Sequence, residues 1–484
     1  MMAFLKSNFL GRAPAPVWVV FVLFALIFSW RLGTVPGLLG DEASEGENVY
    51  ELLASETWTV MGERSYIGPL IDYIRVPWVA MLGYSPLAIR LPMLLALMVM
   101  YWLAWDSLRA MFGPTVGLFA LVGMIFSPAF LLYERLGWAV TLFPVFLWGM
   151  VWLARRGGIY RWLWVGLTAG LGVANHILFF PTVVGAVVAI LASHILRLRW
   201  DRSGRGAVMD GALCVTGFMA GFGTQLAVLL LFPEDQGDAG AGAALVFERV
   251  VDFVKAFPLY VSGSSYVARY IGVEFPKSLQ LIVAAGLLVL SVSALVWKRY
   301  RWQTATWLVG LLVHGGVLLL MIDRFTLRYF VMLSVGVWLL AAVGVGAWWE
   351  RAVRFESLKP WGAVILGVGL VSWAYVGVFS LFIDQGGSVV DFDLGNRTNS
   401  AAAFVDHRPL VACLRGVGPV WSENVHIWNR LRYVSHEYAD LAVLEEKHKS
   451  LALWEVHYRK EDAPGGTSPG DLCPELQHFR VVGR

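Results

Sequence analysis

Five acidic side chains crowd the first dozen positions after Gly40 in an otherwise apolar chain: Asp41, Glu42, Glu45, Glu47 and Glu51. A carboxylate facing hydrocarbon is costly, so this cluster beside an apolar segment indicates a wet or functional cavity with cations nearby. If the segment is helical, Asp41 and Glu45 share a face. Asp41 or Glu42 would then be a general base that takes a proton from an acceptor hydroxyl. The alternative is helix capping, but a cap needs one acid and this stretch supplies several, which favours the base for Asp41.

Two later groups combine an anion or an aromatic ring with a cation. Glu134 and Arg135 follow an apolar run, as a second acid with a cation for a phosphate or as a local interfacial ion pair. Arg324, Arg328 and Tyr329 stand at the start of another apolar run, where a guanidinium suits a phosphate because it binds bidentately and stays charged. The alternative for these two arginines is snorkelling at a helix end.

Single basic residues complete the set of candidates. His176 lies at a break between two apolar runs, where a histidine is more often a core residue than a ligand. Arg90 either lines a pocket or anchors the apolar segment that follows it. Arg64 and Arg75 are further cations that would neutralise the acids of the same loop.

The composition excludes a soluble globule. The chain has 484 residues, of which 58% are hydrophobic and 15% charged, with a mean hydropathy of +0.63; soluble domains have a charged share of about 25%. The net charge of +3 comes from lysines and arginines in small groups between apolar runs, which is typical of cytoplasmic loops and not of nucleic-acid binding. We therefore predict a polytopic, all-α membrane protein.

Segments of about 20 apolar residues predict eleven spans. They are 15–35, 87–108, 114–133, 138–155, 160–176, 177–196, 207–232, 277–297, 303–322, 328–349 and 361–383. With a cytoplasmic N-terminus, the groups of positive charge fall on the cytoplasmic side. These groups are Arg109; Arg155, Arg156 and Arg161; Arg197, Arg199, Arg202 and Arg205; Lys298, Arg299 and Arg301; and Arg351, Arg354 and Lys359. The acidic loop, Tyr133–Arg135, the break at His176 and the tail then all lie on the outer face.

The domain plan follows from these spans. Residues 1–383 form the transmembrane domain, with the first outer loop (36–88) as its catalytic part, and 41–56 and 70–83 as interfacial helices. Outer loop 233–276 begins Gly-rich, as a lid would, and continues with helical spacing. Residues 384–484 form a small extracytoplasmic α/β domain with β-prone runs LVACL, LALWEV and HFRVV and a helix at 436–448. Outside the cytosol, Cys413 and Cys473 are predicted to pair.

An outward-facing cavity that holds a carboxylate base and fixed cations suits transfer of a group from a phosphate-bearing lipid to a hydroxyl. Two alternatives remain. A transporter or flippase of a lipid-linked saccharide would move its substrate without making a bond, although no internal repeat supports a transporter. A non-catalytic scaffold would use the tail to recruit a partner.

The order of several short motifs resembles the membrane glycosyltransferases of the C-type (GT-C) fold, within them the protein O-mannosyltransferase and aminoarabinose transferase group. The resemblance is good over roughly residues 15–200 and looser beyond. The residues that carry it are Asp41-Glu42-Ala43; Tyr66, Gly68, Pro69 and Leu70; Tyr73; Arg90-Leu91-Pro92; Ser127-Pro128; Tyr133 and Arg135; and Arg328-Tyr329.

The resemblance implies an inverting enzyme of a bacterial inner membrane that uses a polyprenyl-phosphate sugar, with Asp41 as the base and no cofactor. Such enzymes generally need no metal, although the acids after Gly40 leave metal binding open. It implies that Arg135, His176 and Arg328, with Tyr329, hold the donor phosphate, and that Tyr66, Tyr73 and Arg90 line the donor and acceptor pocket. Some relatives have a lysine before the loop proline, where this chain has Gly68. The donor-phosphate cation must therefore come from elsewhere.

Overall fold

The computed structural model describes most of the chain. The described residues are 14–34, 40–55, 59–62, 66–127, 130, 133–156, 158, 160–196, 204–231, 243–262, 276–322, 327–384, 408–422, 431–433, 436, 441–444, 452, 454–458, 472–473 and 479–483. They form two compact units. Unit 1 comprises Met1–Trp30, Leu95–Glu134 and Leu142–Val378, and unit 2 comprises Arg31–Leu94, Arg135–Thr141 and Phe379–Arg484. The first outer loop thus groups with the tail, a division that differs from the predicted boundary after residue 383.

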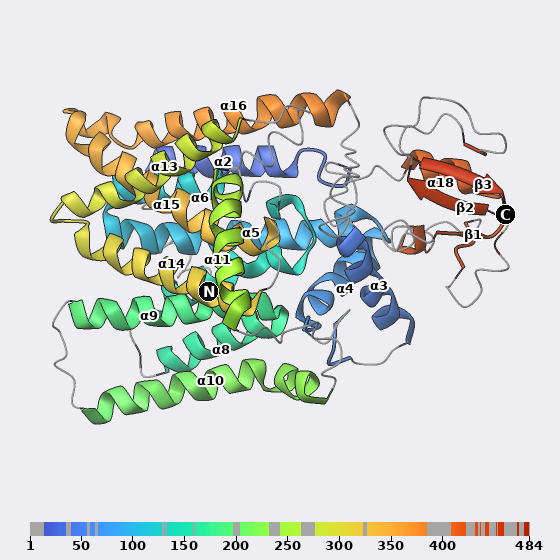
Figure 1. Ribbon diagram of the computed structural model, residues 1–484, viewed down its shortest axis with the longest axis horizontal. Coiled ribbons are helices and arrows are strands. Elements are labelled where there is room, and N and C mark those ends of the chain that lie inside the picture. Colours follow the sequence, from blue (N-terminus) through green and yellow to red (C-terminus); the bar gives the residue numbers. More distant parts are fainter. Residues whose placement is uncertain are drawn as a thin grey trace. The chain divides into compact units, whose positions relative to one another are not determined.

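Each of the eleven apolar segments contains a helix (Figure 1). They are α2 (Ala15–Ser29), α5 (Pro86–Phe112), α6 (Pro114–Ile125), α7 (Phe143–Arg155), α8 (Arg161–Asn175), α9 (Phe180–Leu196), α10 (Gly204–Leu231), α13 (Lys277–Ser293), α14 (Arg301–Met321), α15 (Leu327–Ala352) and α16 (Trp361–Asp384). Among the described residues, five helices are long and apolar enough to cross a membrane: Pro86–Phe112, Val208–Leu231, Lys277–Val296, Arg301–Met321 and Tyr329–Ala352. The predicted break between the fifth and sixth segments is present, because α8 ends at Asn175 and His176 caps the 3₁₀ turn η4 (Ile177–Phe179).

α15 is the most buried of these five helices. In the most apolar 18-residue stretch of α15, 94% of the residues are buried, against 22% in the corresponding stretches of Val208–Leu231 and Lys277–Val296. It packs on α6, α13 and α14 within unit 1. The outward side chains of the other helices are apolar too, for example Leu230 and Leu312 at 72% and 75% exposure. Apolar side chains on both the inner and the outer surface are expected when the solvent is lipid.

Glycines bring two helices of unit 1 together. α8 lies along α10, and Gly166 and Gly170 on one helix and Gly217 and Gly221 on the other lie so close to the partner that a Cβ would overlap its main-chain atoms. Small residues four apart are a common route to close approach of membrane helices. Figure 1 shows the two helices side by side.

The two short helices predicted between the first and second apolar segments are present, as α3 (Gly40–Ser55) and α4 (Leu70–Leu82), and both belong to unit 2. Acidic residues in the first turn of α3 suit its positive end. In α4, Asp72 and Arg75 are buried although charged. Both helices therefore carry charged side chains that need buried partners.

The tail forms a small α/β domain in unit 2. Strands β1 (Val420–Trp421), β2 (Trp454–Tyr458) and β3 (Phe479–Gly483) lie in the order β1-β2-β3, with β1 parallel and β3 antiparallel to β2. Helix α18 (Arg408–Leu414) completes it, and a disulfide joins Cys413 to Cys473. LALWEV and HFRVV contribute to strands as expected.

Two expectations about the tail are wrong. LVACL is the helix α18, because Leu410, Val411 and Leu414 share a helical face that packs into the core of the domain. Residues 441–444, inside the helix expected at 436–448, are not helical, and Val443 makes an isolated bridge to Val420. The rest of that stretch, apart from His436, lies outside the described residues.

The second part of outer loop 233–276 is helical as its spacing predicts, as α11 (Ala243–Val261) in unit 1. Phe257 and Val261 pack in a cluster with Leu287 of α13 and Trp338 of α15. The Gly-rich start of the loop, which we expected to act as a lid, lies outside the described residues.

Candidate active site

Glu42 is fully buried in unit 2 and holds α3 to the start of α5. Arg90 donates to both of its carboxylate oxygens, from Nε to Oε1 at 2.7 Å and from Nη2 to Oε2 at 2.6 Å. The same guanidinium donates to the Leu32 carbonyl at 3.0 Å, and the Gly137 N–H donates to Glu42 Oε1 at 2.6 Å. A buried, bidentate pair with further hydrogen bonds meets the conditions under which a charge pair tolerates burial.

A second buried ion pair lies one turn further along α3. Arg75 of α4 donates to Glu45 Oε2 at 2.7 Å, and Glu45 Oε1 accepts from the Ala139 N–H at 3.3 Å. Arg75 also donates to the Gly137 carbonyl and lies 3.5 Å from Asp72. Both side chains of the Arg75–Glu45 pair are fully buried.

The segment 135–141 is tied to α3 by these two pairs. Gly137 gives its N–H to Glu42 and its carbonyl to Arg75. A Cβ on Gly137 would come within 2.7 Å of the Ile89 carbonyl oxygen, so this position has no room for a side chain. Arg135, two residues before this glycine, is buried at 3% exposure. Arg135 therefore lies in the short segment whose Gly137 and Ala139 are hydrogen-bonded to the two ion pairs.

Asp41 differs from the acids that follow it. Glu42 and Glu45 are fully buried and Glu47 nearly so, whereas Asp41 is half-buried in the first turn of α3. It directly precedes Glu42 and stands one turn before Glu45 on the same face. The two ion pairs thus fix the backbone on which Asp41 stands and leave its side chain partly accessible.

Four further sequence candidates, Glu42, Arg90, Tyr73 and Tyr66, lie at structural positions in unit 2. Glu42 and Arg90 pair with each other, which differs from their expected roles in acceptor activation and in the pocket. The Tyr73 hydroxyl accepts from the Thr59 N–H at 2.9 Å and donates to the Thr59 carbonyl at 2.7 Å, so it anchors the loop between α3 and α4. Tyr66 is half-buried in a turn next to Ile67, whose carbonyl accepts from the Gly62 N–H at 2.9 Å.

The other candidates belong to unit 1. Glu134 is 1% exposed, and neither of its carboxylate oxygens has a hydrogen-bond partner among the described residues. This burial raises the pKa of Glu134 well above its ordinary value. His176 is 3% exposed, and its Nδ1 accepts from the Leu178 N–H at 3.2 Å. Arg328 is in the first turn of α15 with its side chain outside the described residues, and Tyr329 is half-buried.

Sequence reasoning missed a contact between α3 and the tail within unit 2. Arg432 lies 2.9 Å from Glu47, and His436 Nε2 lies 3.1 Å from the same carboxylate. The His436 ring stacks on Tyr50 with centroids 3.5 Å apart. These partners are nearly 400 positions apart, so no local pattern could reveal them.

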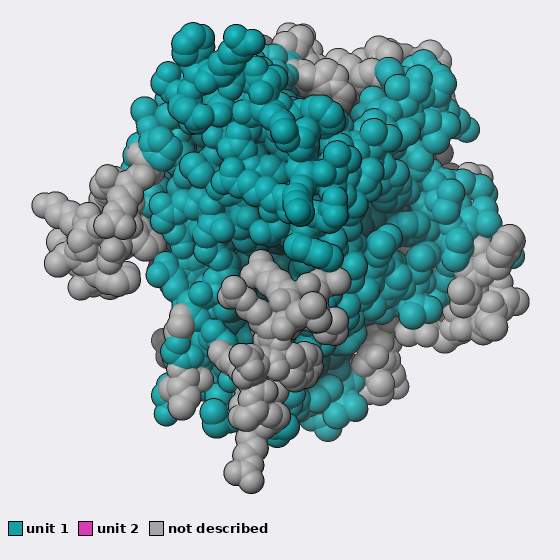
Figure 2. Space-filling model, turned by 90° about the vertical axis from the view of Figure 1, so that its left-hand side faces the viewer, with its two compact units in different colours: residues 1–30, 95–134, 142–378 teal, residues 31–94, 135–141, 379–484 magenta. Residues whose placement is uncertain are grey.

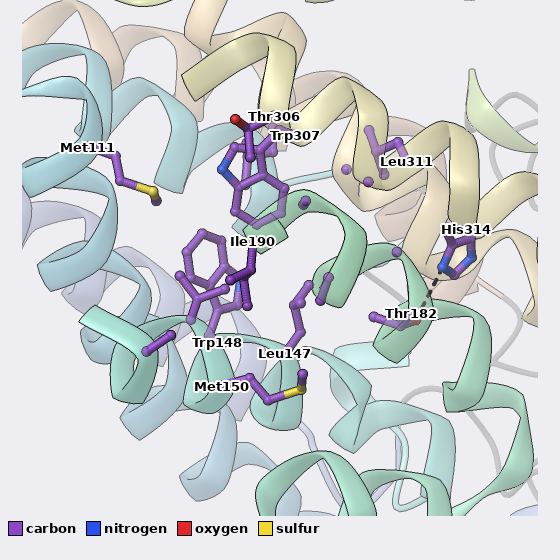
Figure 3. A pocket seen from close by; sticks show the side chains of 18 of the residues that line it. Met111, Leu147, Trp148, Met150, Thr182, Ile190, Thr306, Trp307, Leu311 and His314 are labelled. Atoms are coloured by element: carbon purple, nitrogen blue, oxygen red, sulfur yellow. Dashed lines mark hydrogen bonds between the residues drawn. The ribbon is translucent and has the colours of Figure 1, made fainter. Parts of the chain in front are cut away.

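A cavity of about 480 Å³ in unit 1 was also missed. Side chains of α7, α9, α14 and α15 line it, with Trp148 and Trp307 among them (Figure 3). Thr182 Oγ1 and His314 Nδ1, 3.3 Å apart, form a polar pair at its wall. The lining is otherwise mainly apolar, and its signal in the sequence is no different from that of ordinary membrane helices.

Groups of three or more His, Cys, Asp or Glu that suit a metal ion do not occur in the described part of the chain.

The helices of unit 1, the short helices of the first outer loop and the small α/β tail together define the class: the chain has the GT-C fold of membrane glycosyltransferases, as predicted. ArnT from Cupriavidus metallidurans bound to undecaprenyl phosphate is similar to it, with a TM-score of 0.56 and 14% identity over 97% of this chain and 100% of that chain. The apo state of that ArnT gives a TM-score of 0.55 at 14% identity over 97% of this chain and 98% of that chain.

The oligosaccharyltransferase of Archaeoglobus fulgidus in complex with Zn and sulfate is similar with a TM-score of 0.50 and 11% identity, over 92% of this chain and 68% of that one. No protein-family model and no curated protein matches the sequence. At these identities, the likeness concerns the fold.

Proposed function

We propose that this protein is an inverting glycosyltransferase that moves a sugar from a polyprenyl-phosphate donor to a hydroxyl of a lipid, glycan or protein. The observation that carries the proposal is the half-buried Asp41 on a helix fixed by the Glu42–Arg90 and Glu45–Arg75 pairs. A base held on a rigid support can be aligned with its substrate in advance. The likeness to an ArnT that binds undecaprenyl phosphate, over nearly the whole of both chains, supports the donor class.

In the proposed reaction the acceptor oxygen attacks the anomeric carbon from the side opposite the phosphate. The hydroxyl proton passes to Asp41, a new C–O glycosidic bond forms, and the bond between the anomeric carbon and the phosphate oxygen breaks. The electron pair leaves with the lipid phosphate, whose charge needs fixed cations. Arg135, His176 and Arg328 are proposed for this role.

The remaining candidates take supporting roles in the proposal. Burial raises the pKa of Glu134, and in its protonated form this residue would donate a hydrogen bond to the leaving phosphate. Tyr329 would assist at the phosphate and Tyr66 at the sugar. Glu42, Arg90 and Tyr73 are positioning residues, because their polar atoms bind other parts of unit 2.

The unit 1 cavity supports a lipid substrate. Its volume of about 480 Å³ lies within the range of about 300–1,000 Å³ usual for ligand pockets, and its apolar wall suits a hydrocarbon chain. We place the protein in a bacterial inner membrane, with the N-terminus cytoplasmic and with Asp41 and the α/β tail on the outer face. The proposed reaction uses no cofactor, since the lipid-linked sugar is its substrate.

The test is to incubate the purified full-length protein with undecaprenyl phosphate that carries a labelled sugar, in lipid vesicles that contain candidate acceptors. The proposal expects label in a new glycosidic product and free undecaprenyl phosphate in equal amounts. Label that crosses the bilayer while still attached to its lipid would instead identify a flippase and contradict the proposed transfer.

A further inference from the structure

A second cavity, of about 570 Å³, opens at one end of unit 1. It lies where α13 passes through the 3₁₀ turn η6 (Ala294–Val296) into α14, beside the end of α15 and the 3₁₀ turn η7 (Glu356–Leu358). Figure 2 looks onto this end of unit 1, which is on the left in Figure 1. The predicted orientation assigns this end to the cytoplasmic side.

The lining of this cavity carries an excess of positive charge. Four basic residues line it, Lys298, Arg299, Arg351 and Lys359, against two acidic ones. Lys359 Nζ lies 2.5 Å from Glu356, and Arg299 lies 3.6 Å from Glu350. In the described part of the chain, Lys298 and Arg351 have no carboxylate within ion-pair distance. Two cations are thus left for an anion from outside the chain.

Arg351 is held in a defined orientation. Its guanidinium carbon lies 4.5 Å from the ring centroid of Trp297, and Trp297 packs edge-on against Trp348 with centroids 5.0 Å apart. A guanidinium stacked on a ring is stabilised by the ring face while its edge keeps N–H donors for a phosphate. Arg351 therefore needs little rearrangement to bind such a group.

Exposed aromatic side chains lie close in sequence to the residues that line the cavity. Trp302, Trp348, Phe355 and Trp361 are 47%, 52%, 70% and 40% exposed. Tryptophan gathers at the level of lipid headgroups. At the level of the lipid headgroups, a membrane lipid is a better candidate for the bound anion than a soluble anion is.

We propose that this cavity binds the phosphate headgroup of an anionic phospholipid from the leaflet on that side of the membrane. Basic pockets between membrane helices on the cytoplasmic side recognise such headgroups by charge. The site is separate from the proposed transfer reaction, since it uses none of the residues assigned to that reaction.

The experiment compares lipid binding to full-length protein purified and delipidated in detergent, measured by native mass spectrometry with added phosphatidylglycerol or phosphatidylcholine. The variants are Lys298→Ala with Arg351→Ala, and Arg354→Ala as the matched control. Arg354 is an exposed cation next to α15 that does not line the cavity. Because each cation near a membrane surface is worth about fivefold in lipid affinity, we expect the double variant to bind phosphatidylglycerol about 25-fold more weakly than wild type does and the control to match wild type.

Three results would overturn the proposal: equal binding of both lipids by wild type, full binding by the double variant, or an equal loss in the Arg354→Ala control. If the double variant does not fold, the thermal stability of the wild-type protein in the two lipids tests the proposal. Phosphatidylglycerol vesicles should then raise its Tm and phosphatidylcholine vesicles should not. Inorganic phosphate at millimolar concentration should not displace the lipid, and displacement would identify a site for a soluble anion instead.

Discussion

The ring of Tyr433 occupies the space that a side chain on Gly46 would need: a Cβ at position 46 would lie 2.6 Å from a ring carbon. Tyr433 is fully buried, and its hydroxyl donates to the Ser85 carbonyl at 3.2 Å. A residue of the tail is thus inserted between the middle of α3 and the start of α5. Tyr433 therefore supports the helix that carries Asp41, in addition to the two ion pairs of that helix.

Substitution of Gly46 tests this contact. Alanine in the middle of a helix is better than glycine by about 1 kcal/mol, so Gly46→Ala would stabilise an unobstructed α3. Overpacking against the Tyr433 ring should instead destabilise the fold by about 1–3 kcal/mol, seen as a lower Tm. In a Tyr433→Ala background the same substitution should become neutral or stabilising. A higher Tm for Gly46→Ala in the wild-type background would refute the contact.

Breaking the Glu42–Arg90 pair should be costly. Glu42→Gln leaves a fully buried guanidinium without its counter-ion, for which about 3–5 kcal/mol of unfolding free energy is expected to be lost. Replacing both residues by methionine removes both charges and should recover much of that loss. A double-mutant cycle on thermal unfolding measures the coupling, and additive effects of the two single changes would show that the side chains do not interact.

Glu134 should make stability depend on pH. Its pKa is raised in the folded state above the ordinary 4.5, so the unfolded state releases this proton first as pH rises. Below about pH 4.5, Glu134 is protonated in both states and does not lower the unfolding free energy. As pH rises from about 4.5 to the raised pKa of the folded state, the unfolding free energy falls. Glu134→Gln should therefore match wild type near pH 4 and exceed its unfolding free energy by a growing amount as pH rises towards 7. A pH-independent difference between the two proteins would contradict this account of Glu134.

The disulfide should stabilise the tail domain. Cys413 and Cys473 are 60 residues apart in sequence, and closing a loop of that length is worth about 4 kcal/mol in the chain-entropy account. Cys413→Ser with Cys473→Ser should make the tail sensitive to limited proteolysis while the helices of unit 1 stay resistant. Cys214→Ser, at the free cysteine, is the control. Alkylation of both tail cysteines in the non-reduced native protein would show that the bond does not form.

Much of the helical framework could be predicted because its signals are local. Each apolar run is long enough to predict a helix. The groups of positive charge fall on one side of the membrane only if a break separates two segments at Asn175 and His176, and α8 does end there. The two helices of the acidic loop were predicted as short amphipathic helices, and α3 and α4 confirm them within one residue at each bound. The run LVACL was wrongly predicted to be a strand because apolar and β-branched residues favour strands. In the structure it is helical, because a helix places its apolar side chains in the core of the tail domain.

The partners of the loop acids could not be predicted because they depend on tertiary structure. Nothing near Glu42 in the sequence indicates that Arg90 and the Gly137 N–H, 48 and 95 positions away, complete its hydrogen bonds. Asp41 and Glu42 thus received the same predicted role, and burial is what separates Asp41 from Glu42 and Glu45.

The most direct test of the central claim is the turnover of Asp41→Asn with a polyprenyl-phosphate sugar. Asparagine caps a helix as well as aspartate does, so the substitution removes the base and keeps any capping contribution. Glu51→Gln, at an exposed acid on the same helix, is the matched control. We predict a loss of about 10²–10⁴-fold in kcat with an unchanged Tm and unchanged donor binding. Wild-type turnover by Asp41→Asn would contradict the assignment of Asp41 as the base.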